Sequence, residues 1–141
     1  MRNSIATIAA VSALALVPLL GGAATATAES SGEVGVLSDC PSDGYITRWD
    51  RCTTLSNGII IVNTDTNGDY IKTQYHKTGG STVTAKLGYL RSGTNHWATS
   101  RSMSAGMWYE NSWSVSASCS VVNGLLYSGG TTYQTPAADP C

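Results

Sequence analysis

The sequence contains no phenylalanine, and only 12% of its residues are charged. Lysine and arginine are scattered along the chain without forming a basic cluster, and the formal net charge is −1. Binding to nucleic acid or to an anionic membrane surface needs such a cluster, so the composition argues against both. Serine, threonine, glycine, asparagine and tyrosine are abundant instead, which is typical of a β-protein with a polar surface.

Motifs of common catalytic sites are also absent. The chain has no GxSxG elbow, no HExxH pair and no phosphate-binding loop. His76 and His96 are the only histidines, and a nucleophilic triad would need one of them beside a serine and an acid. The acids are few and lie mostly in turn-like segments, which does not favour a glycosidase pair. We therefore expect a non-enzymatic protein without a cofactor.

Metal-binding patterns are incomplete. No CxxC occurs and the histidines lie far from the cysteines, so a zinc site is disfavoured. Segment 65–69 alternates oxygen-bearing side chains as calcium loops do, but the twelfth position of that loop is His76 where an EF-hand needs a glutamate. Asn67-Gly68 accounts for the same segment as a type I′ hairpin turn. We expect no metal ion.

Residues 1–28 contain, in sequence, the three parts of an export signal. Arg2 supplies the positive charge, 5–20 form an apolar run, and small residues precede an expected cleavage after Ala28. A membrane anchor is the alternative, but the run is shorter than the ~20 residues needed to span a bilayer and contains Pro18. We expect a secreted, extracellular protein with no membrane attachment after cleavage.

Four cysteines follow the leader, and an even number in an exported chain predicts two disulfides. Three pairings are possible, and the sequence alone does not choose among them. We favour Cys40–Cys52 and Cys119–Cys141, because the members of each pair are near in sequence. Each should stabilise the fold by about 2–4 kcal/mol, mainly by restricting the unfolded chain.

The remaining chain divides into an arm and a domain. Residues 29–39 are small and lack helical periodicity, which predicts a flexible N-terminal arm. Val34, Val36 and Leu37 would let this arm add a strand to a partner's sheet, or else pair with its own domain. Residues 40–141 are expected to form a disulfide-stabilised β-domain.

Short apolar or alternating segments dominate this domain, and no segment has the pattern of an amphipathic helix. The run 58–63 is continuously β-branched, as in a strand buried on both faces. The segments expected to be strands are 58–63, 70–77, 81–91, 96–101, 107–119, 124–127 and 131–134. Seven to eight such strands predict an all-β fold, an antiparallel β-sandwich or small barrel.

The chain holds four tryptophans. Strand alternation points Trp113 into the core and Trp108 outward beside Glu110. Outward aromatic rings are shared by sugar-binding platforms and by protein-binding hot spots. A carbohydrate-binding domain would need Trp97, Trp108 and neighbouring tyrosines in one exposed row.

Trp49 lies between Arg48 and Arg51, inside the first expected disulfide loop. An aromatic ring flanked by arginines on a closed loop is a reasonable recognition element. In the alternative, Trp49 plugs the end of the sandwich while the arginines pair with Asp43 or Asp50. Both interpretations stay open at this stage.

The exported β-rich chain, its two expected disulfides and its Arg48-Trp49-Asp50 turn resemble the small proteinaceous α-amylase inhibitors of filamentous actinobacteria. Those proteins block the enzyme's active cleft with a Trp-Arg-aromatic turn. Here the order is reversed, the third residue is an acid and the domain is longer. The resemblance implies inhibition of a foreign enzyme as an alternative function.

The alanine-rich leader, the apolar arm at 34–37 and the disulfide-closed β-domain also resemble the small adaptor subunit of actinobacterial umbrella toxin particles. That subunit joins a lectin subunit to a large toxin subunit through its extended N-terminal segment. We therefore predict a secreted module that binds another secreted protein, with a glycan as the alternative partner. The expected contact residues are Val34, Val36, Leu37, Arg48, Trp49, Arg51 and Trp108.

Overall fold

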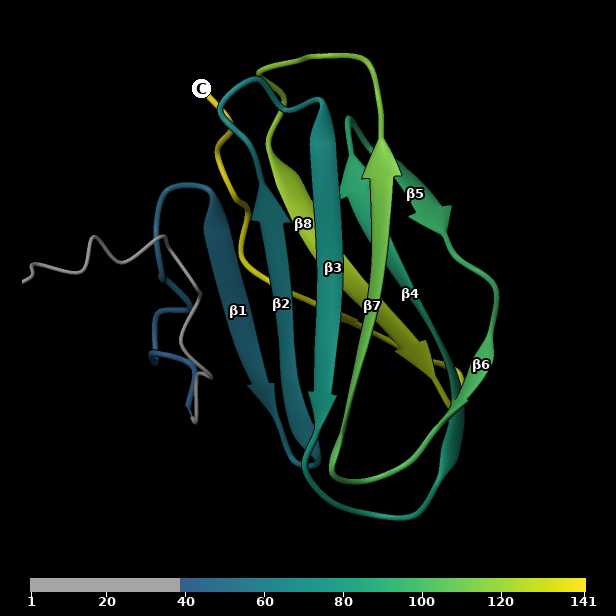
Figure 1. Ribbon diagram of the computed structural model, residues 1–141. Coiled ribbons are helices and arrows are strands. Elements are labelled where there is room, and N and C mark those ends of the chain that lie inside the picture. Colours follow the sequence, from purple (N-terminus) through teal and green to yellow (C-terminus); the bar gives the residue numbers. More distant parts are fainter. Residues whose placement is uncertain (1–38) are drawn as a thin grey trace, which may run out of the picture. The chain divides into compact units, whose positions relative to one another are not determined.

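A computed structural model describes residues 39–141 of the protein (Figure 1). The expected leader, and the arm residues Val34, Val36 and Leu37, lie outside these described residues. All regular structure in residues 39–141 is β-strand, which confirms the all-β prediction. This part of the chain contains no helix long and apolar enough to cross a membrane.

Nine strands form two antiparallel sheets that pack face to face as a sandwich (Figure 1). Sheet A has the order β1-β2-β3-β7, and sheet B has the order β5-β4-β8-β9 with β6 also paired to β4. The strands are β1 (Asp50–Leu55), β2 (Gly58–Thr64), β3 (Tyr70–Lys77), β4 (Val83–Arg91), β5 (Thr94–Trp97), β6 (Arg101–Met103), β7 (Met107–Ser114), β8 (Val122–Ser128) and β9 (Thr131–Gln134).

Strand β2 is buried on both faces, as its continuous β-branched run predicts. Ile60 and Val62 point into the core between the sheets. Ile59 and Ile61 point the other way and are covered by residues of segment 40–46. Full burial of one such side chain contributes about 1.5–3 kcal/mol, so this strand anchors sheet A on two sides.

Two clusters of buried side chains fill the space between the sheets. The first consists of Ile60, Tyr75, Ala85, Leu87, Met103 and Leu126, and the second of Val62, Ile71, Tyr89, Val122 and Ala138. Trp113 packs against the second cluster and meets Tyr89 edge-on, with 5.0 Å between ring centroids. The prediction that Trp113 points inward is therefore confirmed.

The chain crosses between the sheets at opposite ends of the sandwich (Figure 1). After β3 it passes into sheet B as β4, after β6 it returns to sheet A as β7, and after β7 it crosses again to β8. Strand β7 pairs with β3 and strand β8 pairs with β4, so these three crossings bring distant segments together in both sheets. This arrangement exposes one face of each sheet to solvent over β3, β7, β4 and β8.

Both favoured disulfides are confirmed. Cys40 and Cys52 are bonded with 5.8 Å between their Cα atoms, and Cys119 and Cys141 with 5.2 Å. The first bond joins β1 to the segment that covers its outer face, and the second joins the β7–β8 connection to the C-terminal segment. No cysteine in the described residues is free.

The predicted type I′ turn at Asn67-Gly68 is wrong. Only Gly68 has a positive φ, of 64°, whereas that turn requires positive φ at both central residues. Asp65 instead organises a longer loop, because its carboxylate accepts hydrogen bonds from the backbone N–H groups of Asp69 (3.0 Å) and Tyr70 (3.3 Å). The Gly68 N–H also donates to the Asp65 carbonyl at 3.3 Å, so a longer loop organised by Asp65 replaces the tight hairpin.

Other strand limits also differ from the predictions. Ser92 and Gly93 both adopt positive φ, 50° and 76°, and form a two-residue turn that lets pairing resume at once in β5. The single strand expected at 96–101 is therefore two short strands, β5 and β6. The strand expected at 107–119 ends at Ser114, and β1 was not expected at all.

Candidate functional site

Trp49 lies on the surface and belongs to none of the buried clusters; 36% of it is exposed. The guanidinium of Arg48 stands 6.0 Å from the centre of its ring. Arg48 also forms an ion pair with Asp139 at 3.4 Å, and both side chains are about half exposed. The indole is thus presented at the surface beside a positive charge, and it does not plug the end of the sandwich.

The Trp49 loop, residues 47–50, is held by its own hydrogen bonds. The Thr47 hydroxyl donates to the Asp50 carboxylate at 2.7 Å and accepts from the backbone N–H groups of Trp49 and Asp50. The backbone carbonyl of Arg48 accepts a hydrogen bond from the N–H of Asp139 at 2.8 Å. These bonds fix the position of the Trp49 backbone relative to β1 and the C-terminal segment.

Arg51 contacts the backbone of the Trp49 loop. Its guanidinium donates to the backbone carbonyl groups of Thr47 and Asp50, and it stacks over Tyr45 at 4.3 Å. Within residues 39–141 no ion pair joins an arginine to Asp43 or Asp50, so the arginine pairings of the alternative interpretation are absent there. Arg51 therefore braces the loop, while Arg48 stays near the exposed ring.

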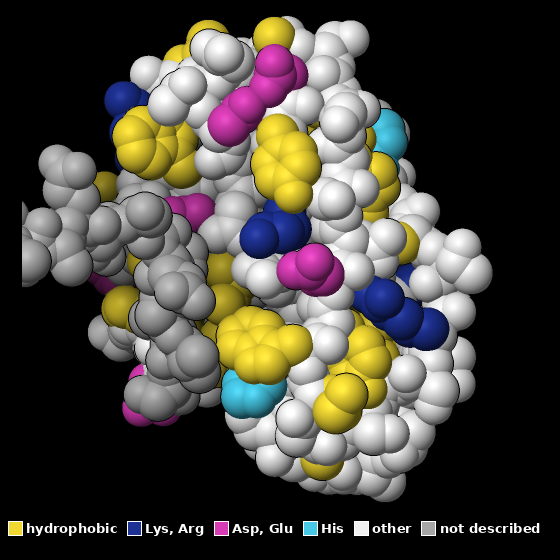
Figure 2. Space-filling view, in the orientation of Figure 1, with side chains coloured by type: hydrophobic (Ala, Val, Ile, Leu, Met, Phe, Trp, Pro, Cys, Tyr) yellow, Lys and Arg dark blue, Asp and Glu magenta, His cyan; other side chains and the backbone are white. Residues whose placement is uncertain are grey.

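Trp108 lies on the outer face of sheet A, as predicted, and is 41% exposed. It is the direct cross-strand partner of His76, and the two rings stack with centroids 4.3 Å apart at an angle of 2°. The next pair along the strands is joined by a hydrogen bond of 3.2 Å from Gln74 to Glu110. Figure 2 shows this surface, where hydrophobic, basic and acidic side chains alternate.

We call this surface the β3–β7 face. It consists of Tyr70, Lys72, Gln74, His76, Trp108, Glu110, Ser112 and Ser114. All eight residues are exposed or half-buried. A flat, exposed surface with an aromatic ring and several hydrogen-bonding side chains can bind a partner by stacking and polar contacts.

Trp97 lies on the opposite side of the molecule, on the outer face of sheet B. The Lys86 ammonium stands 4.9 Å from the Trp97 ring and 5.1 Å from the Tyr127 ring, and these two rings meet edge-on at 6.1 Å. Trp97 and Trp108 therefore do not share one exposed row. Sequence reasoning missed the Trp97–Lys86–Tyr127 cluster, since its geometry depends on the Ser92–Gly93 turn.

Neither histidine has the surroundings of a catalytic base. His76 stacks on Trp108, and His96 stacks on Tyr89 at 4.4 Å. Within residues 39–141, neither imidazole hydrogen-bonds to a serine or an acid, and no group of acids, histidines and cysteines there could hold a metal ion. The absence of enzymatic activity stays a prediction, since no observation tests it.

The pKa values of the two carboxyl groups in the Asp65 loop, those of Asp65 and Asp69, shift in opposite directions. A side-chain hydrogen bond with Asp69 lowers the pKa of Asp65 below its ordinary value of 3.8, and backbone N–H groups of the loop act in the same direction. The same shared hydrogen bond, together with the nearby negative charge, raises the pKa of Asp69. Of the two carboxyl groups, that of Asp65 holds the loop by accepting from backbone N–H groups.

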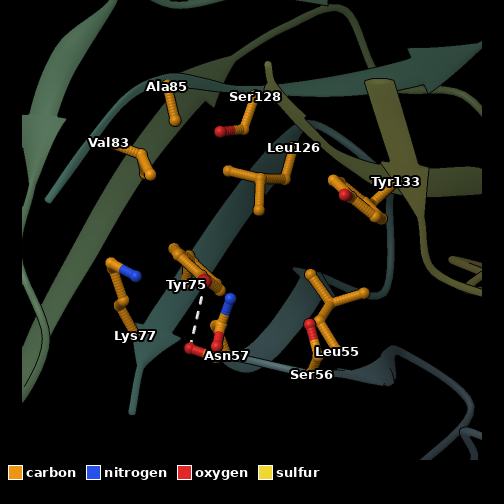
Figure 3. Close-up of a pocket in the computed structure, with 10 residues that line it drawn as sticks. All are labelled: Leu55, Ser56, Asn57, Tyr75, Lys77, Val83, Ala85, Leu126, Ser128 and Tyr133. Carbon is orange, nitrogen blue, oxygen red and sulfur yellow. Dashed lines mark hydrogen bonds between the residues drawn. The ribbon is translucent and has the colours of Figure 1, made fainter. Parts of the chain in front are cut away.

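A cavity of about 80 Å³ opens between the sheets beside the β1–β2 turn (Figure 3). It is lined by Leu55, Ser56, Asn57, Tyr75, Lys77, Val83, Ala85, Leu126, Ser128 and Tyr133. The Tyr75 hydroxyl donates to the backbone carbonyl of Asn57 at 3.2 Å, and burial raises the pKa of Tyr75. Sequence reasoning did not single out any residue of this cavity.

Comparisons with known proteins give no match. No family model matches the chain, and neither a curated protein nor a solved structure matches it.

Proposed function

We propose that this protein is a secreted, non-enzymatic module that binds another secreted protein through the Trp49 loop. The observation that supports this most directly is an exposed indole on a loop whose backbone is already fixed. Tryptophan and arginine are the residues most enriched in binding hot spots. A loop that is ordered before binding loses little conformational entropy on association, which favours affinity.

Arg48 and Arg51 have different roles in this proposal. Arg48 lies at the edge of the Trp49 ring and contacts the partner directly, exchanging its exposed pair with Asp139 for a partner acceptor. Arg51 is a positioning residue, because its guanidinium holds two carbonyl groups of the loop. Loss of Arg51 would then weaken binding by loosening the loop.

A more specific form of the proposal is an adaptor subunit of an extracellular, antibacterial toxin-type complex. Here Val34, Val36 and Leu37 add a strand to one partner while the Trp49 loop contacts a second. The apolar residues of the arm and the export signal support this form. Two separate contacts on one small domain are what an adaptor requires.

The test is affinity recovery from the producer's culture supernatant with tagged mature chain, followed by calorimetry with the purified partner. We expect stoichiometric recovery of a defined secreted protein, and at least about 30-fold weaker binding for Trp49→Ala, the loss typical of a hot spot. Tyr127→Ala, an exposed aromatic residue on sheet B, is the matched control and should bind normally. Equal affinity of both variants would refute the Trp49 loop as the contact.

Deletion of residues 29–39 tests the adaptor form separately. If the arm engages a second protein, this deletion removes that protein from the recovered complex while the Trp49 partner remains. An α-amylase assay with the same variants tests the inhibitor alternative, in which Trp49→Ala would abolish inhibition. A chain that recovers no partner and inhibits no enzyme would contradict both protein-binding proposals.

Trp97 and Trp108 do not form the single aromatic row expected of a carbohydrate-binding domain, but the β3–β7 face by itself favours carbohydrate binding as a second candidate function. Trp108 is exposed there beside the hydrogen-bonded Gln74–Glu110 pair, which combines a stacking surface with groups that bind hydroxyls. A glycan array with wild type, Trp108→Ala and Trp49→Ala separates the candidates. Glycan binding that is lost only with Trp108→Ala would favour this face over the Trp49 loop.

A further inference from the structure

Lys77 is buried inside the sandwich. It is 1% exposed and shares the inward face of β3 with Ile71, Thr73 and Tyr75. A lysine is almost never fully buried without a partner, because desolvation of a charged ammonium costs several kcal/mol. Its position at the wall of the cavity described above therefore needs an explanation.

The ammonium of Lys77 is only partly satisfied by the protein. It donates one hydrogen bond, to the backbone carbonyl of Gly79, although an ammonium has three donors. Within residues 39–141 the ion pair of Arg48 with Asp139 is the only one, so no described carboxylate neutralises Lys77. Figure 3 shows its amino group directed toward the middle of the ring of cavity side chains.

The cavity has a polar mouth and an apolar floor. Ser56, Asn57 and Tyr133 are exposed and surround the mouth, whereas Ala85 and Leu126 are each 2% exposed at the floor. A volume of about 80 Å³ has room for several water molecules or for a few heavy atoms of a ligand. The cavity opens to solvent at this mouth, but Lys77 is only 1% exposed, so a solute contacts its ammonium only after small movements of the lining side chains.

We propose that this cavity binds a small aliphatic carboxylate, with the carboxylate accepting hydrogen bonds from the Lys77 ammonium and the aliphatic tail resting on Ala85 and Leu126. A monoanion supplies the charge and the acceptors that Lys77 lacks. The apolar floor favours a short hydrocarbon tail over a fully hydrated anion such as phosphate. This site is separate from the Trp49 loop and does not rest on the proposed function.

The test is a titration of the disulfide-bonded mature protein with isobutyrate, followed by NMR of the backbone amides and the Ala85 and Leu126 methyl groups. Isobutyramide, which has the same shape and no charge, is the matched ligand control. We expect saturable shifts at Lys77, Ala85 and Leu126 with isobutyrate up to about 50 mM, and at least about tenfold weaker binding of isobutyramide. Equal responses to both ligands, or no response to isobutyrate, would overturn the proposal.

Two lysine variants sharpen the test. Lys77→Met keeps the length of the side chain and removes the charge, so isobutyrate binding should disappear, whereas Lys86→Met on the outer face of sheet B should bind as wild type does. Shifts that persist in Lys77→Met would place the ligand elsewhere and refute the site. If Lys77→Met fails to fold, the comparison of the two ligands on the wild-type protein still decides.

Discussion

The indole of Trp97 lies directly on Gly88, its cross-strand partner in the β4–β5 pair. A Cβ atom placed on Gly88 would stand 2.5 Å from Cε3 of this indole, closer than such atoms approach in folded proteins. Because residue 88 is a glycine and has no side chain, the Trp97 indole can pack against the backbone of sheet B. From there the ring reaches Lys86 and Tyr127.

Gly88→Ala should lower the free energy of unfolding by about 1–3 kcal/mol, because the added methyl group must displace the indole or the strand backbone. Urea denaturation followed by tryptophan fluorescence measures the change. Gly79→Ala is the control, since a Cβ there would meet only Asn57 Oδ1 at an ordinary 3.9 Å. Equal losses for both variants would contradict the packing of Trp97 on Gly88.

The two disulfides should contribute unequally. Removal of either bond frees the unfolded chain and costs about 3 kcal/mol by loop entropy. Cys52 is also fully buried beside Ile59 and Ile61, so Cys40→Ala/Cys52→Ala additionally leaves a cavity under segment 40–46. We expect this variant to lose more stability than Cys119→Ala/Cys141→Ala, despite its shorter loop. Chemical denaturation of both variants checks the ranking.

Alkaline conditions should destabilise the fold through Tyr75. Burial, with the nearby Tyr133 as a smaller cause, raises the pKa of Tyr75 above its ordinary value of 10.0. The folded state then holds the proton more tightly than the unfolded state, so this contribution is complete below about pH 10 and is lost as pH rises through the raised pKa. Urea denaturation at a series of alkaline pH values should show the decline.

Tyr75→Phe removes the titrating group and should make that decline shallower. It also loses the hydrogen bond to the Asn57 carbonyl, which costs about 1 kcal/mol at neutral pH. Tyr127→Phe, at an exposed position, should keep the wild-type pH dependence. A decline that is unchanged in Tyr75→Phe would assign the effect to another group, such as Tyr89, whose pKa burial also raises.

Arg101 protects an edge of sheet A. Strand β7 is the last strand of that sheet in residues 39–141, and the Arg101 guanidinium donates to its Glu110 carbonyl at 2.6 Å and to Asn111 Oδ1 at 3.0 Å. A charged side chain over a strand edge hinders pairing with a second chain. Arg101→Ala should therefore self-associate more during refolding, as measured by light scattering, whereas Arg48→Ala should not.

Local patterns were enough to predict part of this structure. The β-branched run of β2 predicts burial on both faces, and the alternation of β3 and β7 places Trp108 outside and Trp113 inside. These features depend only on neighbouring residues. The disulfide pairing also follows from sequence proximity, although sequence alone leaves other pairings open.

Other features depend on tertiary contacts. The residues of β1 are mostly polar, and its strand character comes from pairing with β2 and from the covering segment 40–46. The position of Trp97 depends on the turn at Ser92-Gly93. The Ser-Gly pair predicts a turn there, but not the positive φ of Ser92 that makes it a tight two-residue turn. The burial of Lys77 was not predicted, because a long charged side chain at the end of a strand usually reaches water.

The three crossings between the sheets also determine how the chain can fold. Strand β3 pairs with β7, and β4 pairs with β8, and in both cases a long segment of chain separates the two partners. Each sheet is therefore completed only after that segment has folded and the later strand has reached its partner. Folds dominated by such distant pairings form slowly, on a scale of about milliseconds to seconds, because loop closure precedes most of the favourable contacts. During this time the inner faces of β2 and β4 are open to solvent. If the chain is exported, as we propose, we expect it to depend on chaperoning until β7 and β8 are in place.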